Sequence, residues 1–265
     1  MTFAVSPLSR NKNERAASVF TPEALLREAR RQKGLPAADV PSICILDPDG
    51  DIVRRLQRTG EAKRFDAWPC YHTELYAFSL EGQTVGIVGC AVGAPFAVLV
   101  AEQLFAAGCR LLISLTSAGQ IVPAAAPPYF VIIDRALRDE GTSHHYAAPG
   151  EFAEADAALV GMAAGSLKDS GQSVFLGASW TTDAPFRETA EAIEAARSKD
   201  ILAVEMEAAA LYTFARTKRV AVLCLAHVTN TMGQKGEDFE KGESDGTADA
   251  LAVLAAIVRK AGRVA

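Results

Sequence analysis

Long apolar runs are missing from this sequence of 265 residues. No segment approaches the roughly 18 uncharged apolar residues that a membrane helix requires, and Met1–Phe20 contains no sustained apolar stretch of the kind that directs export. We therefore expect neither membrane insertion nor export.

Paired cysteines are also missing. The five cysteines are odd in number and form no Cys-x-x-Cys motif: Cys44, Cys70, Cys90, Cys109 and Cys224. Most lie in apolar stretches, which is typical of reduced thiols that pack as small hydrophobic side chains. This usage favours the cytoplasm as the location of the protein.

Clustered basic residues are scarce. The chain has 27 basic and 32 acidic residues, a net charge of −5, and its only basic group lies within residues 27–33. A surface that follows the phosphates of a nucleic acid needs many more adjacent cations. We therefore expect no nucleic-acid partner.

The composition is that of a globular protein. Hydrophobic residues make up 49% and charged residues 22%, without a step between two halves. These values exclude disorder, collagen and coiled coil, and the length allows a sizeable core without disulfides or a metal. We expect residues 1–40 to form a tail with a peripheral helix near residues 22–32, and residues 41–265 to form a single domain.

Short β-branched runs alternate with helical stretches. Strands are predicted at 42–46, 84–88, 110–115, 129–133, 173–180 and 219–228, and helices at 95–106, 156–167, 187–198, 207–216 and 247–260. Most of the strands are continuous apolar runs, as burial on both faces of a sheet requires. The pattern predicts a three-layer αβα domain, with a loop over residues 118–128 at a strand end.

Polar residues follow several of these strands, where ligand sites of open α/β sheets gather. Thr116-Ser117-Ala118-Gly119 is either a capped turn or an approach to an anion or a sugar. Residues 138–146 are either a solvated loop or part of a site. His144 and His145 are adjacent and have no third ligand at a suitable spacing, so we expect no metal site.

Two later segments carry stronger signals. In Thr181–Arg187, an aromatic ring, an arginine and Asp183 precede a helix that Asp183 would otherwise cap. In AVEMEAAALY, Glu205 and Glu207 flank Met206 where an apolar strand turns into an apolar helix. Burying these carboxylates without partners would cost several kcal/mol, whereas a vicinal diol would supply two hydroxyl donors. The alternative is an exposed first helical turn, in which the helix dipole favours acids.

The order of TSAGQIVP, RDEGTSHHY, TTDAPFR and VEMEAAALY resembles that of the nucleoside phosphorylase and nucleosidase superfamily, over residues 42–258. The uridine phosphorylase-like members are the most similar, and VEMEAAALY is the most specific segment. The resemblance implies an α/β fold, a three-layer αβα sandwich with a mixed, partly barrel-like central sheet. It also implies a homo-oligomer, such as a dimer or a trimer of dimers, and cleavage of an N-glycosidic bond to ribose without a cofactor.

The resemblance also implies roles for individual residues. Glu207 would hold the ribose hydroxyls, Met206 would pack against the sugar and Glu205 would support them. Fixed anions around the ring suit the oxocarbenium-like sugar that forms when the bond breaks. The base would lie near Asp183, with Pro185 or Phe186 stacked on it and Arg187 at its carbonyl oxygens. Ser117 is at the position of the family's phosphate-binding hydroxyl and Thr116 is next to it, so these two residues would form the phosphate or water site.

The sequence departs from the family pattern at the phosphate site. Phosphorylases of this family usually hold phosphate with three arginines, and here the corresponding stretches read LDPDGD, YHT and SLT. The first stretch has three aspartates in five residues, Asp47, Asp49 and Asp51, which would repel a dianion. Arg54 or Arg55, one turn later, is a candidate substitute.

A second departure concerns the leaving base. Purine-specific members place an aspartic acid at the position of Asn230, and an amide cannot donate a proton to the base. The sequence therefore favours a pyrimidine or a 6-oxopurine. His227 lies on the predicted strand that precedes Asn230, with two residues between them, and we expect it to be a packed strand residue whose side chain faces the other side of the sheet.

These observations predict a nucleoside phosphorylase-like pentosyltransferase whose partners are a nucleoside and inorganic phosphate. Two alternatives stay open. One is a phosphate-independent nucleoside hydrolase, which the missing arginines favour. The other is a nucleoside-binding protein that keeps the fold without turnover.

Overall fold

The structure is a computed structural model that describes residues 7–10, 12–14, 16–232, 239–242 and 244–262. Residues 1–6, 11 and 15 of the expected tail lie outside this part of the chain. The described residues form one ten-stranded sheet. Its strands are β1 (Ile43–Asp47), β2 (Lys63–Arg64), β3 (Tyr76–Leu80), β4 (Gln83–Gly89), β5 (Leu111–Gln120), β6 (Tyr129–Asp139), β7 (Phe152–Glu154), β8 (Val174–Thr182), β9 (Ile201–Glu205) and β10 (Ala221–Asn230).

The sheet is mixed and closes on itself in one part. Its order is β10-β6-β8-β9-β5-β1-β4-β3-β2, and β10 also pairs with β5, which joins β5, β10, β6, β8 and β9 into a ring. The β10–β6 and β5–β9 pairs are antiparallel, while the β10–β5, β6–β8 and β8–β9 pairs are parallel. The partly barrel-like mixed sheet implied by the resemblance is therefore confirmed.

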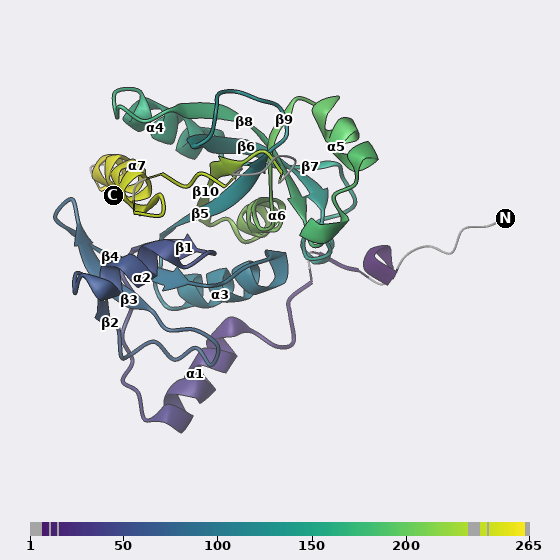
Figure 1. The fold of residues 1–265 in the computed structure, drawn as a ribbon. Coiled ribbons are helices and arrows are strands. Elements are labelled where there is room, and N and C mark those ends of the chain that lie inside the picture. The colour runs from purple at the N-terminus through teal and green to yellow at the C-terminus, as the bar shows by residue number, and fades with distance from the viewer. Residues whose placement is uncertain (1–6, 11, 15, 233–238, 243, 263–265) are drawn as a thin grey trace.

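Helices cover both faces of the sheet (Figure 1). The α-helices are α1 (Pro22–Lys33), α2 (Asp51–Arg58), α3 (Ala94–Ala106), α4 (Ala157–Leu167), α5 (Ala190–Arg197), α6 (Ala208–Lys218) and α7 (Thr247–Ala261), and the 3-10 turns are η1 (Pro7–Ser9), η2 (Ser143–His145) and η3 (Pro185–Arg187). One apolar cluster packs α3 and α6 on the sheet, and a second packs α2, α4 and α7. This is the expected three-layer αβα arrangement.

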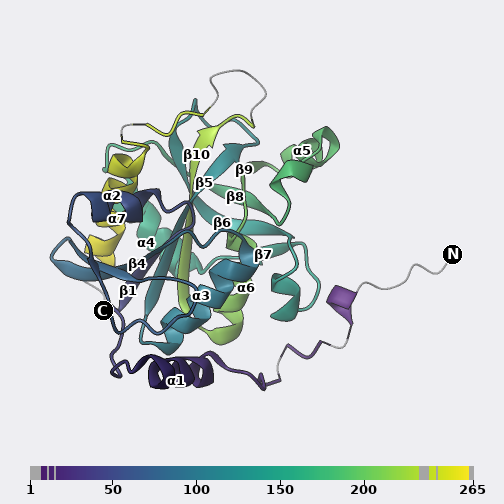
Figure 2. The same cartoon turned by 60° about the horizontal axis from the view of Figure 1, so that its bottom comes forward.

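Helix α1 lies at the outside of this layered body, below α3 in Figure 2. The Thr21 hydroxyl accepts a hydrogen bond from the N–H of Ala24, Pro22 opens the first turn, and Gly34 ends the helix in a left-handed conformation. Lys33 Nζ donates to the carbonyl oxygens of Pro69 and Cys70, at 2.9 and 2.7 Å. No helix among the described residues is long and apolar enough to cross a membrane.

Three predicted boundaries were wrong. Strand β5 continues to Gln120, so Thr116–Gly119 is strand and not a turn, and the predicted loop over 118–128 begins only at Ile121. The register explains this extension, because Ser117 pairs with His227 and Gly119 with Val204. Strand β6 likewise runs to Asp139 along β8.

The third boundary concerns α5. This helix begins at Ala190 and not at Arg187, because residues 185–187 form a 3-10 turn. Its cap is Thr189, whose hydroxyl accepts from the N–H of Ala192. Asp183 therefore does not cap α5.

Candidate active site

Glu205 ends β9, and its carboxylate fastens the turn into α6. The carboxylate accepts four hydrogen bonds, from the hydroxyls of Ser179 and Thr181 at 2.9 and 2.5 Å and from the N–H groups of Glu207 and Ala208, both at 2.7 Å. Burial raises the pKa of Glu205, and these donors act in the opposite direction. Because the chain itself uses these acceptor positions, Glu205 is suited to hold the turn and not to contact a ligand.

Glu207 immediately precedes α6 and is only 1% exposed. Its Oε1 accepts from the N–H of Gly93 at 2.7 Å, whereas its Oε2 is buried and accepts no hydrogen bond within the described residues. Burial, and secondly the charge of Glu205, raise the pKa of Glu207 to about 8, while Gly93 and the Thr116 hydroxyl lower it. A buried carboxylate oxygen without a donor is costly, and ligand hydroxyls would satisfy it.

Strand β5 brings Thr116 and Ser117 to this region. Successive strand residues point to opposite faces. The Thr116 hydroxyl donates to the carbonyl of Ser117 at 3.3 Å and is close enough to Glu207 to lower its pKa. Ser117 instead binds Asp49 in the loop after β1. Its N–H donates to Oδ2 of Asp49 at 2.7 Å and its hydroxyl donates to Oδ1 at 2.9 Å.

A small cavity lies between the β1–α2 loop, β5 and β10. Its polar lining consists mainly of Asp47, Asp49, Asp51, Ser117, His227 and Lys241. Asp47 is buried, and its pKa is raised to about 7, chiefly by burial, with smaller contributions from the charges of Asp49 and Asp51. The expected electronegative loop is therefore part of this cavity.

His227 is a packed strand residue, as expected. It is 6% exposed and stacks on Phe130 with ring centroids 4.4 Å apart. Burial lowers the pKa of His227 to about 4, so the ring is neutral at physiological pH. Its Nε2 is buried without a hydrogen-bond partner among the described residues, and its side chain lines the cavity that contains Asp49.

The cations beside the cavity are engaged with other groups. Arg54 donates to Asp51 at 2.6 Å and to the carbonyl of Asp49 at 2.8 Å. Arg55 donates to the hydroxyl of Thr247 at 3.0 Å, and Lys241 donates to Asp51 at 2.6 Å.

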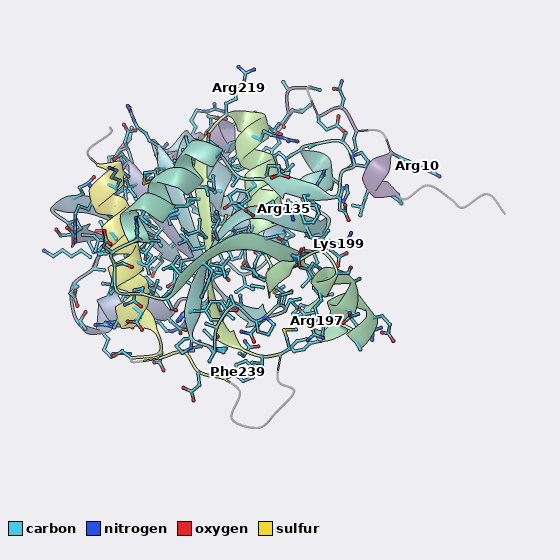
Figure 3. The ribbon with its side chains drawn as sticks, turned by 90° about the horizontal axis from the view of Figure 1, so that it is seen from above. Arg10, Arg135, Arg197, Lys199, Arg219 and Phe239 are labelled. Atoms are coloured by element: carbon cyan, nitrogen blue, oxygen red, sulfur yellow. The ribbon has the colours of Figure 1, made fainter. Side chains whose placement is uncertain are left out.

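Asn230 lies at the end of β10, beside Gly119. Its Oδ1 accepts from the N–H of Met232 at 2.9 Å, and its Nδ2 is 3.4 Å from the carbonyl of Ala118. The chain then returns to β10, because the N–H of Glu240 donates to the carbonyl of Thr229 at 2.7 Å. The preceding residue, Phe239, is exposed at the outer edge of the molecule (Figure 3).

Within the predicted base loop, Thr181 bonds to Glu205, but the residues from Asp183 onward make other contacts. The carboxylate of Asp183 accepts from the N–H of Gly141 at 2.8 Å, and Asp183 lines a larger, mainly apolar hollow beside α3. Phe186 is 98% exposed. The structure thus joins Glu205 and Glu207 directly and brings Thr116 beside Glu207. Among the described residues, the Asp183 carboxylate bonds to Gly141 and not to these glutamates, and the Phe186 ring is exposed.

Two features of the site were missed from the sequence. The Gly93 N–H that binds Glu207 comes from the start of α3, and Gly93 has a φ of 89°, which favours glycine. The second feature is the contact between Asp49 and Ser117. The LDPDGD run indicated negative charge, but nothing in the sequence paired one of its carboxylates with a residue 68 positions later.

Comparison with known proteins identifies the relatives of this chain. A guanosine phosphorylase of Halorubrum lacusprofundi is 26% identical over 210 residues, which is 74% of this chain and 87% of the relative. A uridine phosphorylase of Thermococcus kodakarensis is 24% identical over 217 residues, covering 71% and 78%.

Solved structures show the same fold. A uridine phosphorylase from Vibrio fischeri matches with a TM-score of 0.73 at 19% identity, covering 88% of this chain and 99% of the other. A purine nucleoside phosphorylase from Toxoplasma gondii matches with a TM-score of 0.71 at 16% identity, covering 84% and 90%. The family model of the phosphorylase superfamily matches residues 42–260. The chain therefore belongs to the phosphorylase superfamily.

Proposed function

We propose that this protein cleaves the N-glycosidic bond of a nucleoside and transfers the ribosyl group to phosphate, as a pentosyltransferase. Its family and its relatives, which are named guanosine, purine nucleoside and uridine phosphorylases, support this function. In the reaction a phosphate oxygen bonds to C1′ of the ribose, and the electron pair of the broken bond remains on the base. No cofactor takes part in this exchange.

The observation that carries the proposal is the buried, half-satisfied carboxylate of Glu207. Its Oε2 has no hydrogen-bond donor among the described residues, and ribose offers two adjacent hydroxyls that fit such an acceptor. An anion fixed at this position also stabilises the positive charge that develops on the sugar in the transition state. We assign Glu207 to the ribose hydroxyls, the half-buried Met206 to the sugar face, and Glu205 to positioning the turn that carries both.

The base is proposed to be a pyrimidine or a 6-oxopurine. Asn230 supports this choice, because its amide donates or accepts a hydrogen bond but cannot protonate a leaving purine. The loop with Asp183, Phe186 and Arg187 would complete the base site. Its exposed aromatic ring offers a stacking surface.

A second candidate, hydrolysis, is favoured by one observation. The N–H and the hydroxyl of Ser117, which are the donors proposed to hold phosphate together with the Thr116 hydroxyl, are both bonded to Asp49. If phosphate does not reach this position, water takes its place at C1′ and the products are ribose and the free base. No observation favours the third alternative, a binding protein without turnover.

Release of free base from a panel of nucleosides, with and without phosphate, tests these functions. We expect uridine or inosine to be cleaved, and ribose 1-phosphate to form when phosphate is present. Free ribose as the product in both conditions would instead establish hydrolysis. Binding without any release of base would establish the non-catalytic alternative.

We further propose that the protein is a cytoplasmic homo-oligomer, and that residues 1–40 form a tail and peripheral helix beside a single domain. The exposed apolar side chains Phe20, Val92 and Leu99 support association, and the five free cysteines support a reducing compartment. Light scattering coupled to size-exclusion chromatography measures the number of subunits. A monomeric mass at micromolar concentration would refute the oligomer.

A further inference from the structure

The donors of Ser117 are satisfied by a carboxylate of the chain itself. Oδ2 of Asp49 receives the backbone N–H at 2.7 Å, and Oδ1 receives the hydroxyl at 2.9 Å. An N–H and an O–H that converge in this way form a binding position for an anion with two oxygens. A carboxylate presents two such oxygens, as does inorganic phosphate. Asp49 therefore occupies the position that a phosphate bound to Ser117 would need.

The loop that carries Asp49 is held on both sides. The buried carboxylate of Asp47 accepts from the N–H groups of Gly50 and Val53, at 3.2 and 2.9 Å, and the Asp47 carbonyl accepts from Cys90 at 3.0 Å. Arg54 donates to the carbonyl of Asp49 at 2.8 Å. Because these bonds fix the backbone around Asp49, its side chain is pre-positioned at Ser117.

The surrounding charges oppose the entry of a second anion. Asp51 lines the same cavity as Asp49, and Asp49 is close enough to Glu207 to raise the pKa of that carboxyl. Lys241 and Arg54 are engaged with Asp51, and Arg55 is engaged with Thr247. A dianion would thus have to displace a bound carboxylate in a cavity whose neighbouring cations already have partners.

The cavity also contains an unused polar group. His227 lines it, is buried, and has an Nε2 atom without a hydrogen-bond partner among the described residues. Buried polar atoms are rarely left in this state unless a ligand or water satisfies them. His227 is thus an unsatisfied polar group among the residues that line the cavity around Asp49.

We propose that Asp49 determines the acceptor specificity of the enzyme: its carboxylate holds the anion position at Ser117, and phosphate binds there only by displacing it. This inference rests on the proposed function, since it concerns the acceptor half of the same site. With Asp49 in place, phosphate is a weak acceptor and water competes for C1′. Without Asp49, the Ser117 donors become free for phosphate.

The test compares Asp49→Ala and Asp49→Asn with the unmodified protein. Calorimetry with inorganic phosphate, at constant ionic strength, measures binding without requiring turnover, and base release at varied phosphate measures the apparent KM. We expect Asp49→Ala to lower both the Kd and the KM of phosphate by at least about tenfold. Asp49→Asn, which loses the charge but keeps one acceptor oxygen, should show an intermediate effect, and thermal unfolding shows that each variant is folded.

Asp245→Asn is the matched control. Asp245 lines the same cavity and is exposed, and both donors of Ser117 are bonded to Asp49 instead. Replacing Asp245 therefore changes the charge by the same amount without freeing the Ser117 donors. We expect this variant to change the phosphate Kd by no more than about twofold. If Asp245→Asn and Asp49→Ala tighten phosphate binding equally, the effect is one of general charge and the proposal is overturned. An unchanged phosphate Kd in the two Asp49 variants would also overturn it.

The outcomes separate the two proposals. Tighter phosphate binding in Asp49→Ala, together with no cleavage of any nucleoside by any variant, would refute the proposed function and support the role of Asp49 at Ser117. Cleavage that is equally dependent on phosphate with and without Asp49 would support the function and refute the role of Asp49.

Discussion

The sugar end and the base end of the proposed site are built in different ways. At the sugar end, Glu205 and Glu207 are buried between β9 and α6, and Glu205 accepts four hydrogen bonds from the chain. At the base end, Phe186 is 98% exposed on a short loop. The first region is pre-organised by the fold, whereas the aromatic ring of the second is open to solvent and free to meet a ligand. Substitutions should therefore affect turnover and stability at the sugar end, and mainly specificity at the base end.

The largest effect is expected at Glu207. Glu207→Gln keeps the shape of the side chain but removes the charge opposite the developing oxocarbenium, so kcat/KM should fall by at least about 100-fold. The variant should unfold at the same or a higher urea concentration, because a costly buried charge has been removed. A loss of less than about threefold in kcat/KM would exclude Glu207 from the ribose site.

Glu207 should also make stability and activity change in opposite directions with pH. Because the folded pKa is raised from 4.5 to about 8, the folded state binds the proton more tightly than the unfolded chain does. The contribution of this group to stability is therefore complete below pH 4.5 and declines as the pH rises to about 8, by at most about 1.4 kcal/mol per pH unit. If the anion binds ribose, kcat/KM should rise over the same range. Glu207→Gln should abolish this rise and make the decline in stability smaller, while Asp47, whose pKa is raised to about 7, keeps its own share of that decline.

The next largest effect is expected at Glu205, and it concerns the stability of the fold. The Glu205 carboxylate accepts hydrogen bonds from two backbone N–H groups and two hydroxyls. Glu205→Gln replaces one of its oxygens with an NH2 group, which would face these donors instead of accepting from them. We expect a loss of about 1–3 kcal/mol in the free energy of unfolding, measured with urea. Ser198→Ala, at the exposed end of α5, serves as the control. Equal stability of Glu205→Gln and the unmodified protein would mean that Glu205 does not hold the turn.

Features that depend on the local sequence could be predicted, and features that depend on pairing between distant segments could not. The junction at 205–207 was located because buried carboxylates between apolar segments demand partners. Helix α2 was not predicted, because its eight residues are mostly charged or polar and its apolar side chains, Ile52, Val53 and Leu56, are too few to establish a period. The extension of β5 through Ser117 was not predicted either, since it depends on pairing with β10 and β9 and not on local propensity.

Contacts between distant loops were the least accessible to prediction. The aspartates after β1 were recognised as a source of negative charge, but the bond from Asp49 to Ser117 depends on how the β1–α2 loop and β5 meet in space. The N–H of Gly93 is a backbone donor, and its partner Glu207 is 114 residues away. Roles that the resemblance implied for side chains outside these contacts, such as Arg187, stay predictions.

A smaller effect is expected at Asn230. Asn230→Asp keeps the oxygen that accepts from the N–H of Met232 and adds a group that can protonate a leaving purine. We expect the ratio of kcat/KM for adenosine to that for uridine to rise by about tenfold, with inosine between them. If the unmodified protein already prefers adenosine by about tenfold, Asn230 is not the residue that faces the leaving base.

The smallest effect is expected at Phe186. Its ring is exposed, so Phe186→Ala should change the free energy of unfolding by less than about 0.5 kcal/mol. If the ring stacks on the base, the KM of the preferred nucleoside should rise by about threefold to tenfold, because an aromatic pair is worth about 0.5–1.5 kcal/mol. Leu176→Ala removes an exposed apolar side chain near the opposite end of β8 and should leave the KM unchanged. An unchanged KM in Phe186→Ala, combined with a smaller mass in light scattering, would assign the ring to contact between subunits and remove it from the base site.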